Sequence, residues 1–133
     1  MANSKRIMIV DDSEVDILIN RKCIEIGSFP CDITCKQSAK SALEYLLEVT
    51  DELMPDIIFL DVKMPEMDGF EFLDRLFSKK ISRGRMKVVI LTSSMAPEDI
   101  TRAREYIKHG VVDYLEKPLT SKLDYLRKIL HAN

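Results

Sequence analysis

Short apolar runs alternate along the chain with segments whose apolar residues recur at helical spacing. The runs at 7–10, 57–60 and 88–91 are apolar throughout, and each one ends at a polar side chain. Runs of this kind are typical of strands that are buried on both faces of a parallel sheet. Residues 31–35 alternate apolar with polar side chains, which predicts a strand at the sheet edge, and residues 114–116 predict a short fifth strand.

Five further segments carry apolar stripes with the spacing of an α-helix. We expect these stripes to form the buried faces of five helices: Val15, Leu18, Ile19, Cys23 and Ile26; Ala39, Ala42, Leu43, Leu46 and Leu47; Phe70, Leu73, Leu76 and Phe77; Ile100, Ala103 and Ile107; Leu123, Leu126 and Leu130. Gly27 and Gly110 suit positions just past the first and fourth helices.

Capping residues mark several of the predicted helix ends. Ser38 is a candidate N-cap of the second helix, and Thr120 or Ser121 of the fifth. Pro97 suits the first turn of the fourth helix. Residues 50–54 are expected to extend the second helix.

The elements form five repeats of a strand followed by a helix. Such repeats predict right-handed crossovers and a parallel sheet with helices on both faces. We therefore expect an α/β fold, a doubly wound five-stranded sheet of flavodoxin-like order 2-1-3-4-5 with five helices. The length of 133 residues suits one domain over 1–133, with a core at about 5–130.

Composition excludes several classes of partner. The net charge is −2, so bulk electrostatics favour neither nucleic acid nor a membrane surface. No apolar run reaches the roughly 20 residues of a membrane span, and the first residues lack the pattern of a signal peptide, so we expect a cytoplasmic protein. The odd set of Cys23, Cys31 and Cys35 argues against a disulfide framework.

Polar residues with chemical potential follow four of the predicted strands. Asp11 and Asp12 follow the first strand, Asp61 the third, Thr92 the fourth and Lys117 the fifth. The carboxyl ends of parallel strands share one edge of the sheet, where open α/β folds bind ligands. The three carboxylates suit Mg²⁺, and with an ammonium and a hydroxyl they predict a phosphate-sized anion site. A carboxylate in such a site is a candidate nucleophile that forms an aspartyl-phosphate.

Four segments together resemble the receiver domains of two-component response regulators. They are residues 7–12, 56–69, 89–94 and 113–118, and the resemblance covers roughly residues 5–130. It implies a signalling domain that takes a phosphoryl group from a sensor histidine kinase or a histidine phosphotransfer protein. Its only reactions would be self-catalysed phosphoryl transfer and autodephosphorylation.

The same resemblance implies roles at single positions. Asp61 is expected to be the phosphoacceptor, and Asp11 and Asp12 to bind Mg²⁺ together with Asp61 and the backbone carbonyl of Lys63. Thr92 corresponds to the switch hydroxyl.

The remaining roles concern the phosphate lysine and the switch. Lys117 corresponds to the phosphate-binding lysine, Tyr114 to the switch aromatic, and the Lys117–Pro118 bond is expected to be cis. Gly69 is expected to supply unusual backbone dihedrals in the loop after the phosphoacceptor. The face made by the fourth helix, fifth strand and fifth helix is expected to bind a downstream protein.

Two other functions stay open at this point. An Mg²⁺-dependent phosphohydrolase also uses an aspartyl nucleophile, but normally in a D-x-D pattern after the first strand, whereas Asp11 and Asp12 are adjacent here. A degenerate receiver that only binds protein is disfavoured by the full set of acids, threonine and lysine. The sequence shows no helix-turn-helix or catalytic segment after Leu130. The protein is therefore either a stand-alone receiver or a piece of a longer regulator, and we expect a stand-alone regulator.

Overall fold

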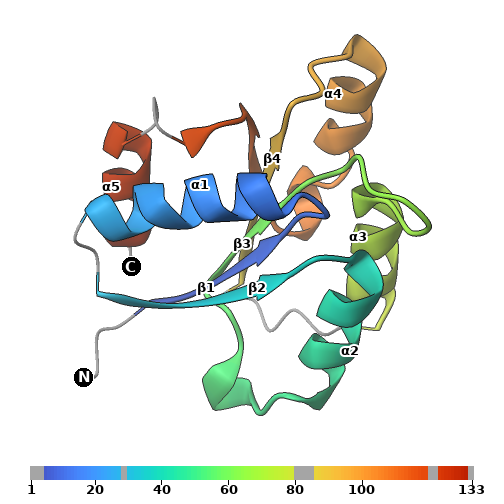
Figure 1. The fold of residues 1–133 in the computed structure, drawn as a ribbon. Coiled ribbons are helices and arrows are strands. Elements are labelled where there is room, and N and C mark those ends of the chain that lie inside the picture. The colour runs from blue at the N-terminus through green and yellow to red at the C-terminus, as the bar shows by residue number, and fades with distance from the viewer. Residues whose placement is uncertain (1–4, 28–29, 80–85, 120–122, 132–133) are drawn as a thin grey trace.

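The structure is a computed structural model that describes residues 5–27, 30–79, 86–119 and 123–131. Strands and helices alternate along the described chain (Figure 1). The elements in order are β1 (Lys5–Val10), α1 (Glu14–Ile26), β2 (Cys31–Lys36), α2 (Ala39–Glu48), the 3₁₀ helix η1 (Asp51–Leu53), β3 (Ile57–Leu60), α3 (Gly69–Ser78), β4 (Lys87–Thr92), α4 (Pro97–Arg104), the 3₁₀ helix η2 (Ile107–His109), β5 (Val111–Glu116) and α5 (Leu123–His131).

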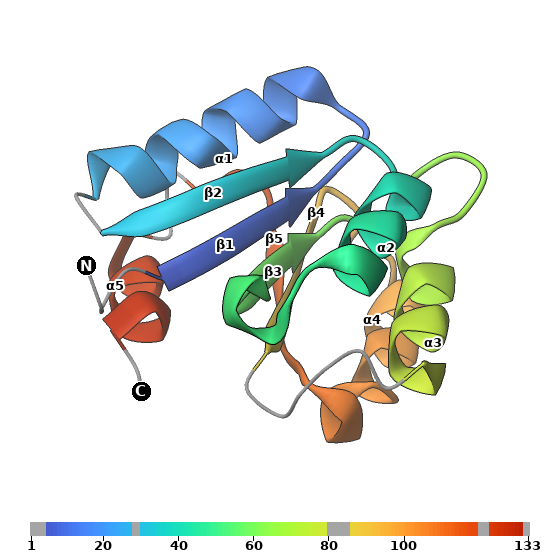
Figure 2. The ribbon, with the colours of Figure 1, turned by 90° about the horizontal axis from the view of Figure 1, so that it is seen from below.

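The strands form one parallel sheet in the order β2-β1-β3-β4-β5. Figure 2 shows β2 at one edge, with β1 next to it and β3 on the other side of β1. This arrangement confirms the predicted flavodoxin-like order, the five strands and the five α-helices. Strand order reverses between β1 and β3, so the residues that follow these two strands are neighbours in space.

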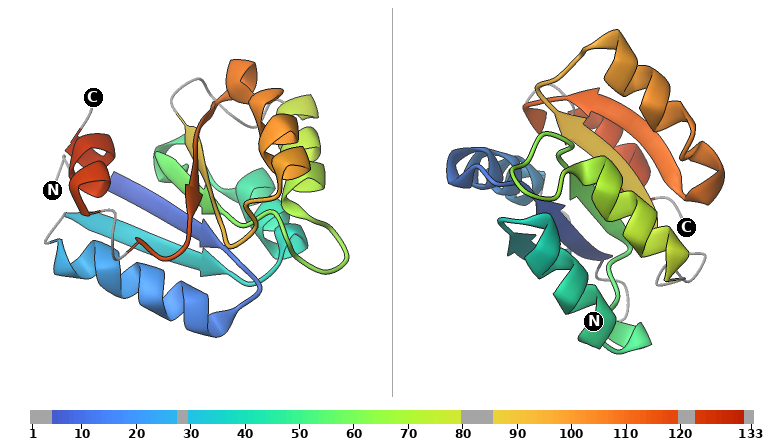
Figure 3. Two further views of the ribbon diagram at one scale, coloured as in Figure 1. Left: turned by 90° about the horizontal axis from the view of Figure 1, so that it is seen from above. Right: turned by 90° about the vertical axis from the view of Figure 1, so that its right-hand side faces the viewer.

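Helices cover both faces of the sheet. Helices α1 and α5 lie on one face, and α2, α3 and α4 lie on the other (Figure 3). Side chains of β3 show why its sequence is apolar throughout: Ile58 and Leu60 belong to the core under α2, α3 and α4, while Ile57 and Phe59 belong to the core under α1 and α5. A strand that is buried on both sides needs no polar face.

The predicted buried face of α1 is largely wrong. Only Cys23 of the predicted stripe is buried, whereas Val15 is 64% and Ile26 is 72% exposed. The buried residues of this helix are instead Ile17, Asn20, Cys23 and Ile24. Apolar residues recur at helical spacing on two faces of this helix. The face that is buried also carries Asn20, and a polar residue at that position makes the sequence of this face look solvent-exposed.

Several boundaries also differ from those predicted. Residues 50–54 do not extend α2, because Val49 adopts an extended conformation and η1 follows as a separate turn. The fifth strand is longer than residues 114–116 and begins at Val111. The fourth helix ends at Arg104, so Ile107 lies in η2 and is exposed.

The helix caps are described for two of the three predicted positions. The Ser38 hydroxyl accepts a hydrogen bond from the backbone N–H of Ser41 at 3.1 Å, and Pro97 is in the first turn of α4. These two predictions are confirmed. Thr120 and Ser121 lie outside the described residues.

Gly69 is required for close packing rather than for unusual dihedrals. In the described residues, positive φ angles occur at Gly110 (118°) and at Glu66 (66°), and not at Gly69. A Cβ atom on Gly69 would lie 2.6 Å from both the carbonyl oxygen of Asp61 and the Cα of Val62. The first residue of α3 therefore touches the main chain beside Asp61, and any larger residue would push the two apart.

Candidate functional site

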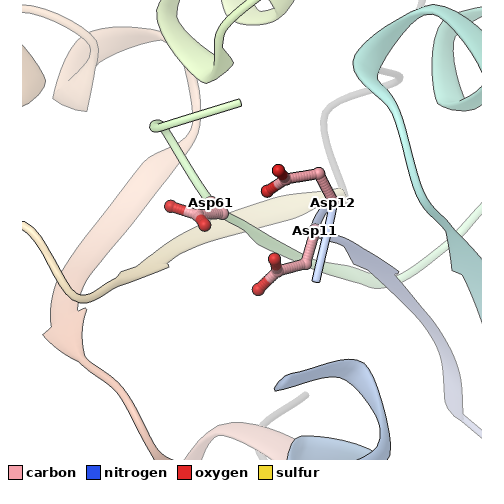
Figure 4. A group of neighbouring side chains, drawn as sticks. All are labelled: Asp11, Asp12 and Asp61. Atoms are coloured by element: carbon pink, nitrogen blue, oxygen red, sulfur yellow. The ribbon is translucent and has the colours of Figure 1, made fainter. Parts of the chain in front are cut away.

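Three carboxylates meet where β1 and β3 end. Asp11 and Asp12 directly follow β1, and Asp61 directly follows β3 (Figure 4). One carboxylate oxygen of each residue lies within 4.8 Å of the other two. Asp11 and Asp61 are buried, whereas Asp12 is exposed. The pairing of β1 with β3 brings together acids that are 50 positions apart in the sequence.

The ammonium of Lys117 lies against this group. Its Nζ is 2.6 Å from Asp11 Oδ2, 2.8 Å from Asp16 Oδ2 and 2.9 Å from Asp61 Oδ2. The Lys117 side chain is only 9% exposed, so its ammonium is largely desolvated. Three carboxylate partners replace that hydration, which is the condition under which a buried charge is tolerated.

Backbone N–H groups hold the other oxygens of the two buried acids. The N–H of Ser13 donates to Asp11 Oδ1 at 2.9 Å, and the N–H of Lys63 donates to Asp61 Oδ1 at 3.1 Å. Each carboxylate is therefore fixed from one side by its own loop. Its second oxygen faces the lysine.

Negative charge exceeds positive charge in this group. The Lys117 ammonium contacts the carboxylates of Asp11, Asp16 and Asp61, and Asp12 lies beside Asp11 and Asp61. With every acid ionised, these four carboxylates and this one ammonium leave three negative charges in excess among the described residues of the group. Burial raises the pKa of Asp11 above its usual value, against the lowering effect of Lys117 and Ser13. Burial lowers the pKa of Lys117, but the hydrogen bonds to the carboxylates together raise it above the ordinary value. The lysine is thus cationic at neutral pH.

Thr92 and Tyr114 lie on the neighbouring strands. Thr92 is buried at the end of β4, and its carbonyl oxygen accepts a hydrogen bond from the backbone N–H of Lys117 at 3.0 Å. Its hydroxyl accepts from the backbone N–H of Ser94 at 3.2 Å. The Tyr114 hydroxyl donates to the carbonyl oxygen of Ser94 at 2.6 Å. Ser94 therefore contacts both predicted switch residues.

Ser94 lies in the loop between β4 and α4, residues 93–96, which we call the Ser94 loop. The same serine joins this loop to α4. Its hydroxyl donates to Asp99 Oδ2 at 2.6 Å, and the ammonium of Lys63 lies 3.1 Å from the same oxygen. The Ser94 hydroxyl, followed by Lys63, lowers the pKa of Asp99 despite its burial. Asp99 thus links the loop after β3, the loop after β4 and the first turn of α4.

Comparison with known proteins identifies the family. A family model of the response regulator receiver domain matches residues 7–130. The chain belongs to this family. The two-component response regulator ORR1 of Oryza sativa subsp. indica is 35% identical over 138 residues, which cover 96% of this chain and 56% of ORR1. The chain spans about a third of the length of the curated protein-glutamate methylesterases that it matches.

Solved response regulators share the fold of this receiver domain. A two-component response regulator from Cytophaga hutchinsonii superposes with a TM-score of 0.80 at 25% identity, covering 96% of this chain and 97% of that one. The phosphorylated cyanobacterial phytochrome response regulator RcpA gives a TM-score of 0.71 at 25% identity, covering 96% and 89%. Both superpositions extend over nearly the whole receiver domain, so its fold is that of a response regulator.

The structure brings most of the predicted site residues of the receiver domain together. Asp11, Asp12, Asp61 and Lys117 form one group, and Thr92 joins it through the backbone of Lys117. The Lys117–Pro118 peptide bond is cis, as predicted. The Tyr114 hydroxyl contacts the Ser94 loop rather than the carboxylates.

Sequence reasoning missed three residues that contact the predicted ones or the segment that carries them. Asp16 pairs with Lys117, Asn20 accepts a hydrogen bond from the backbone of Leu119, and Asp99 pairs with Lys63. Each is a polar residue in a predicted helix. A signal exists for Asn20 alone, because it lies at helical spacing between Ile17 and Ile24 on the buried face of α1.

The donor set of the receiver domain fits a divalent cation. Three carboxylates with an excess of negative charge are hard oxygen ligands of the type that Mg²⁺ binds.

None of the helices described is long and apolar enough to span a bilayer.

Proposed function

We propose that this receiver domain accepts a phosphoryl group on Asp61 from the phosphohistidine of a sensor histidine kinase or a histidine phosphotransfer protein. The observation that carries the proposal is the Lys117 ammonium, 2.9 Å from the Asp61 carboxylate and beside the group of three acids. Phosphoryl transfer needs positioning and charge neutralisation more than it needs covalent chemistry from the protein. A fixed carboxylate next to a buried cation supplies both.

The proposed step transfers one phosphoryl group. A carboxylate oxygen of Asp61 attacks the phosphorus and forms an oxygen–phosphorus bond. The phosphorus–nitrogen bond breaks, and its electron pair returns to the imidazole nitrogen of the donor. Lys117 stays in contact with the phosphorylated side chain and offsets its new negative charge.

Mg²⁺ is the proposed cofactor of this step. Its proposed ligands are the carboxylates of Asp11, Asp12 and Asp61 and the backbone carbonyl of Lys63. When bound, the ion would neutralise charge on the phosphoryl oxygens. The support for this assignment is the excess of negative charge at the group of three acids, which an ammonium alone does not balance.

The proposed switch passes through the Ser94 loop. A phosphoryl group on Asp61 attracts the Thr92 hydroxyl, which accepts from the Ser94 N–H in the unphosphorylated protein. The Tyr114 hydroxyl is bonded to the Ser94 carbonyl, so a shift of that loop releases or moves Tyr114 as well. The proposed result is a rearranged face of α4, β5 and α5 that a downstream protein binds.

Wider aspects of the biology stay predictions. They are the cytoplasmic location, action as a stand-alone regulator, and the absence of enzymatic turnover of a separate substrate. The matched methylesterases are longer proteins, and their named activity is not proposed for this chain. A phosphohydrolase is disfavoured because the proposed nucleophile follows β3 rather than β1.

The proposal is tested with a small phosphoryl donor. Incubation with acetyl phosphate and Mg²⁺, followed by intact mass spectrometry, should add one phosphoryl group to the wild-type protein. The Asp61→Asn variant should gain none, and omission of Mg²⁺ should abolish the reaction of the wild type. An Asp61→Asn protein that still gains the group would overturn the assignment.

A further inference from the structure

Helix α1 contacts the segment that carries Lys117 at two points one helical turn apart. Asp16 Oδ2 lies 2.8 Å from the Lys117 ammonium, and Asn20 Oδ1 accepts a hydrogen bond from the Leu119 backbone N–H at 3.1 Å. Residues four apart on a helix lie on the same face, so both contacts come from one side of α1. The two contacts join segments about a hundred positions apart in the sequence.

The Asn20 contact fixes the main chain beyond the lysine. Asn20 is 1% exposed and lies among the apolar residues of the α1 core, where a polar side chain is tolerated only with a hydrogen-bond partner. Its partner Leu119 is fully buried. On the other side, the Lys117 N–H donates to the Thr92 carbonyl oxygen at 3.0 Å. The backbone around Lys117 is therefore held both before and after residue 118.

The Asp16 contact fixes the ammonium itself. Among the described residues, Asp16 is the only one of the three carboxylates bonded to Lys117 that stands outside the group of three acids. Asp11 and Asp61, which hold the ammonium, are also two of the three acids that would hold a cation. Asp16 is outside that group, so its contact with the ammonium would remain available when a cation or a phosphoryl group is bound.

We infer that Asp16 and Asn20 are positioning residues for the phosphoryl-transfer reaction, which hold the Lys117 ammonium at Asp61. The inference rests on the proposed function of Asp61 and Lys117. Neither residue touches the reacting atoms, and both act through the lysine segment. Asp16 directs the charge, and Asn20 fixes the backbone from which the lysine side chain extends.

A simpler role for Asp16 is a favourable charge in the first turn of a helix. Glu14 shares that turn, is exposed, and has the same charge. The Glu14→Gln variant is therefore a matched control. It removes one negative charge from the same helix end and leaves the contact between Asp16 and Lys117 in place.

The first test is a double-mutant cycle without metal. Urea unfolding in EDTA is measured for the wild type, Asp16→Asn, Lys117→Met and the double variant. We expect Asp16→Asn to lower the urea midpoint in the wild-type background. In the Lys117→Met background it should cause no loss, because the acid then faces only other acids. An equal fall of the urea midpoint in both backgrounds would contradict the inference, because Asp16 would then act only as a favourable charge at the helix N-terminus.

The second test is the rate of phosphorylation by acetyl phosphate in Mg²⁺. We expect Asp16→Asn to slow the reaction about tenfold, as a misplaced catalytic group does. Glu14→Gln should react at the wild-type rate, and Asp16→Asn should add no further loss to Lys117→Met. A wild-type rate in Asp16→Asn would overturn this inference alone. A wild-type protein that is never phosphorylated would overturn the proposed function as well.

The Asn20 contact has a readout of its own. In the Asn20→Ala variant the Leu119 amide loses its acceptor, so its hydrogen exchange should become faster. The phosphorylation rate should fall with it. Unchanged protection of the Leu119 amide would show that Asn20 does not hold this segment.

Discussion

The ammonium of Lys117 lies 2.9 Å from the carboxylate of Asp61, although the two residues are 56 positions apart. Both side chains are more than nine-tenths buried. Removing one partner of a buried ion pair strongly destabilises the folded protein, because the remaining charge is left buried without a partner. The proposed phosphoacceptor is therefore also part of the stability of the fold.

Removal of the lysine should destabilise the protein. We expect Lys117→Met to lower the free energy of unfolding by about 3 kcal/mol in EDTA, because Asp11 and Asp61 lose their common cation. Chemical denaturation followed by circular dichroism measures this. The matched control is Lys22→Met, which removes an exposed lysine from α1 and should change stability by less than about 0.5 kcal/mol.

Mg²⁺ should offset part of that loss. A cation that binds only the folded state stabilises it more as its concentration rises above its dissociation constant. The Lys117→Met variant should therefore gain more stability from Mg²⁺ than the wild type does, because no ammonium competes for the acids. Equal gains in the two proteins would contradict a shared site for lysine and metal.

Substitution of Gly69 should distort the loop beside Asp61. An alanine Cβ would lie 2.6 Å from two main-chain atoms, of Asp61 and of Val62, so Gly69→Ala should cost about 1–3 kcal/mol. Helix propensity alone predicts the opposite sign, since alanine is the better helix former. Gly27→Ala is the control, because Gly27 has an ordinary helical conformation and its replacement should be neutral or slightly favourable.

Asp99 should make stability depend on acid pH. The pKa of Asp99 is lower in the folded state than its ordinary value of 3.8, which applies to the unfolded chain. The ionised Asp99 therefore contributes its full stabilisation of the fold above pH 3.8, and this stabilisation is lost as the pH falls through the lower folded pKa. Asp99→Asn should cost about 1–2 kcal/mol at pH 7, for the lost charged hydrogen bond with Ser94.

The cost of Asp99→Asn should shrink towards zero as the solution is acidified below that folded pKa. Urea unfolding of both proteins at several pH values gives the difference directly. A cost that stays constant with pH would mean that the carboxylate charge of Asp99 contributes nothing.

Loss of the Tyr114 hydroxyl should loosen the Ser94 loop. Tyr114→Phe removes the hydrogen bond to the Ser94 carbonyl and should cost about 1 kcal/mol of stability in the unphosphorylated protein. Because that bond holds the unphosphorylated arrangement in the proposed switch, affinity for beryllofluoride should rise. Titration calorimetry with beryllofluoride and Mg²⁺ measures it, and a lower affinity would place the bond in the phosphorylated arrangement instead.

Most of the fold could be predicted because its strands are short, apolar and ended by polar residues. The run at 57–60 indicates a strand with two buried faces, and the structure places it in the middle of the sheet. The proximity of Asp11 and Asp61 follows from the parallel pairing of β1 with β3, since residues that directly follow neighbouring parallel strands lie at the same edge of the sheet.

The unpredicted features depend on packing across distant segments. The periodicity of α1 allowed two faces, and only contact with the sheet selects the one that buries Asn20. The contact of Asp16 with Lys117 and that of Asp99 with Lys63 require the positions of two loops and two helices at once. Neither follows from local sequence.

The site of phosphorylation tests the central claim most directly. The protein is treated with acetyl phosphate and Mg²⁺, the acyl phosphate is reduced with borohydride, and the modified residue is located by peptide mass spectrometry. We predict that the modification lies at residue 61 and that it is absent from Asp61→Asn. Modification at Asp11, Asp12 or any residue other than Asp61 in the wild-type protein would contradict the claim.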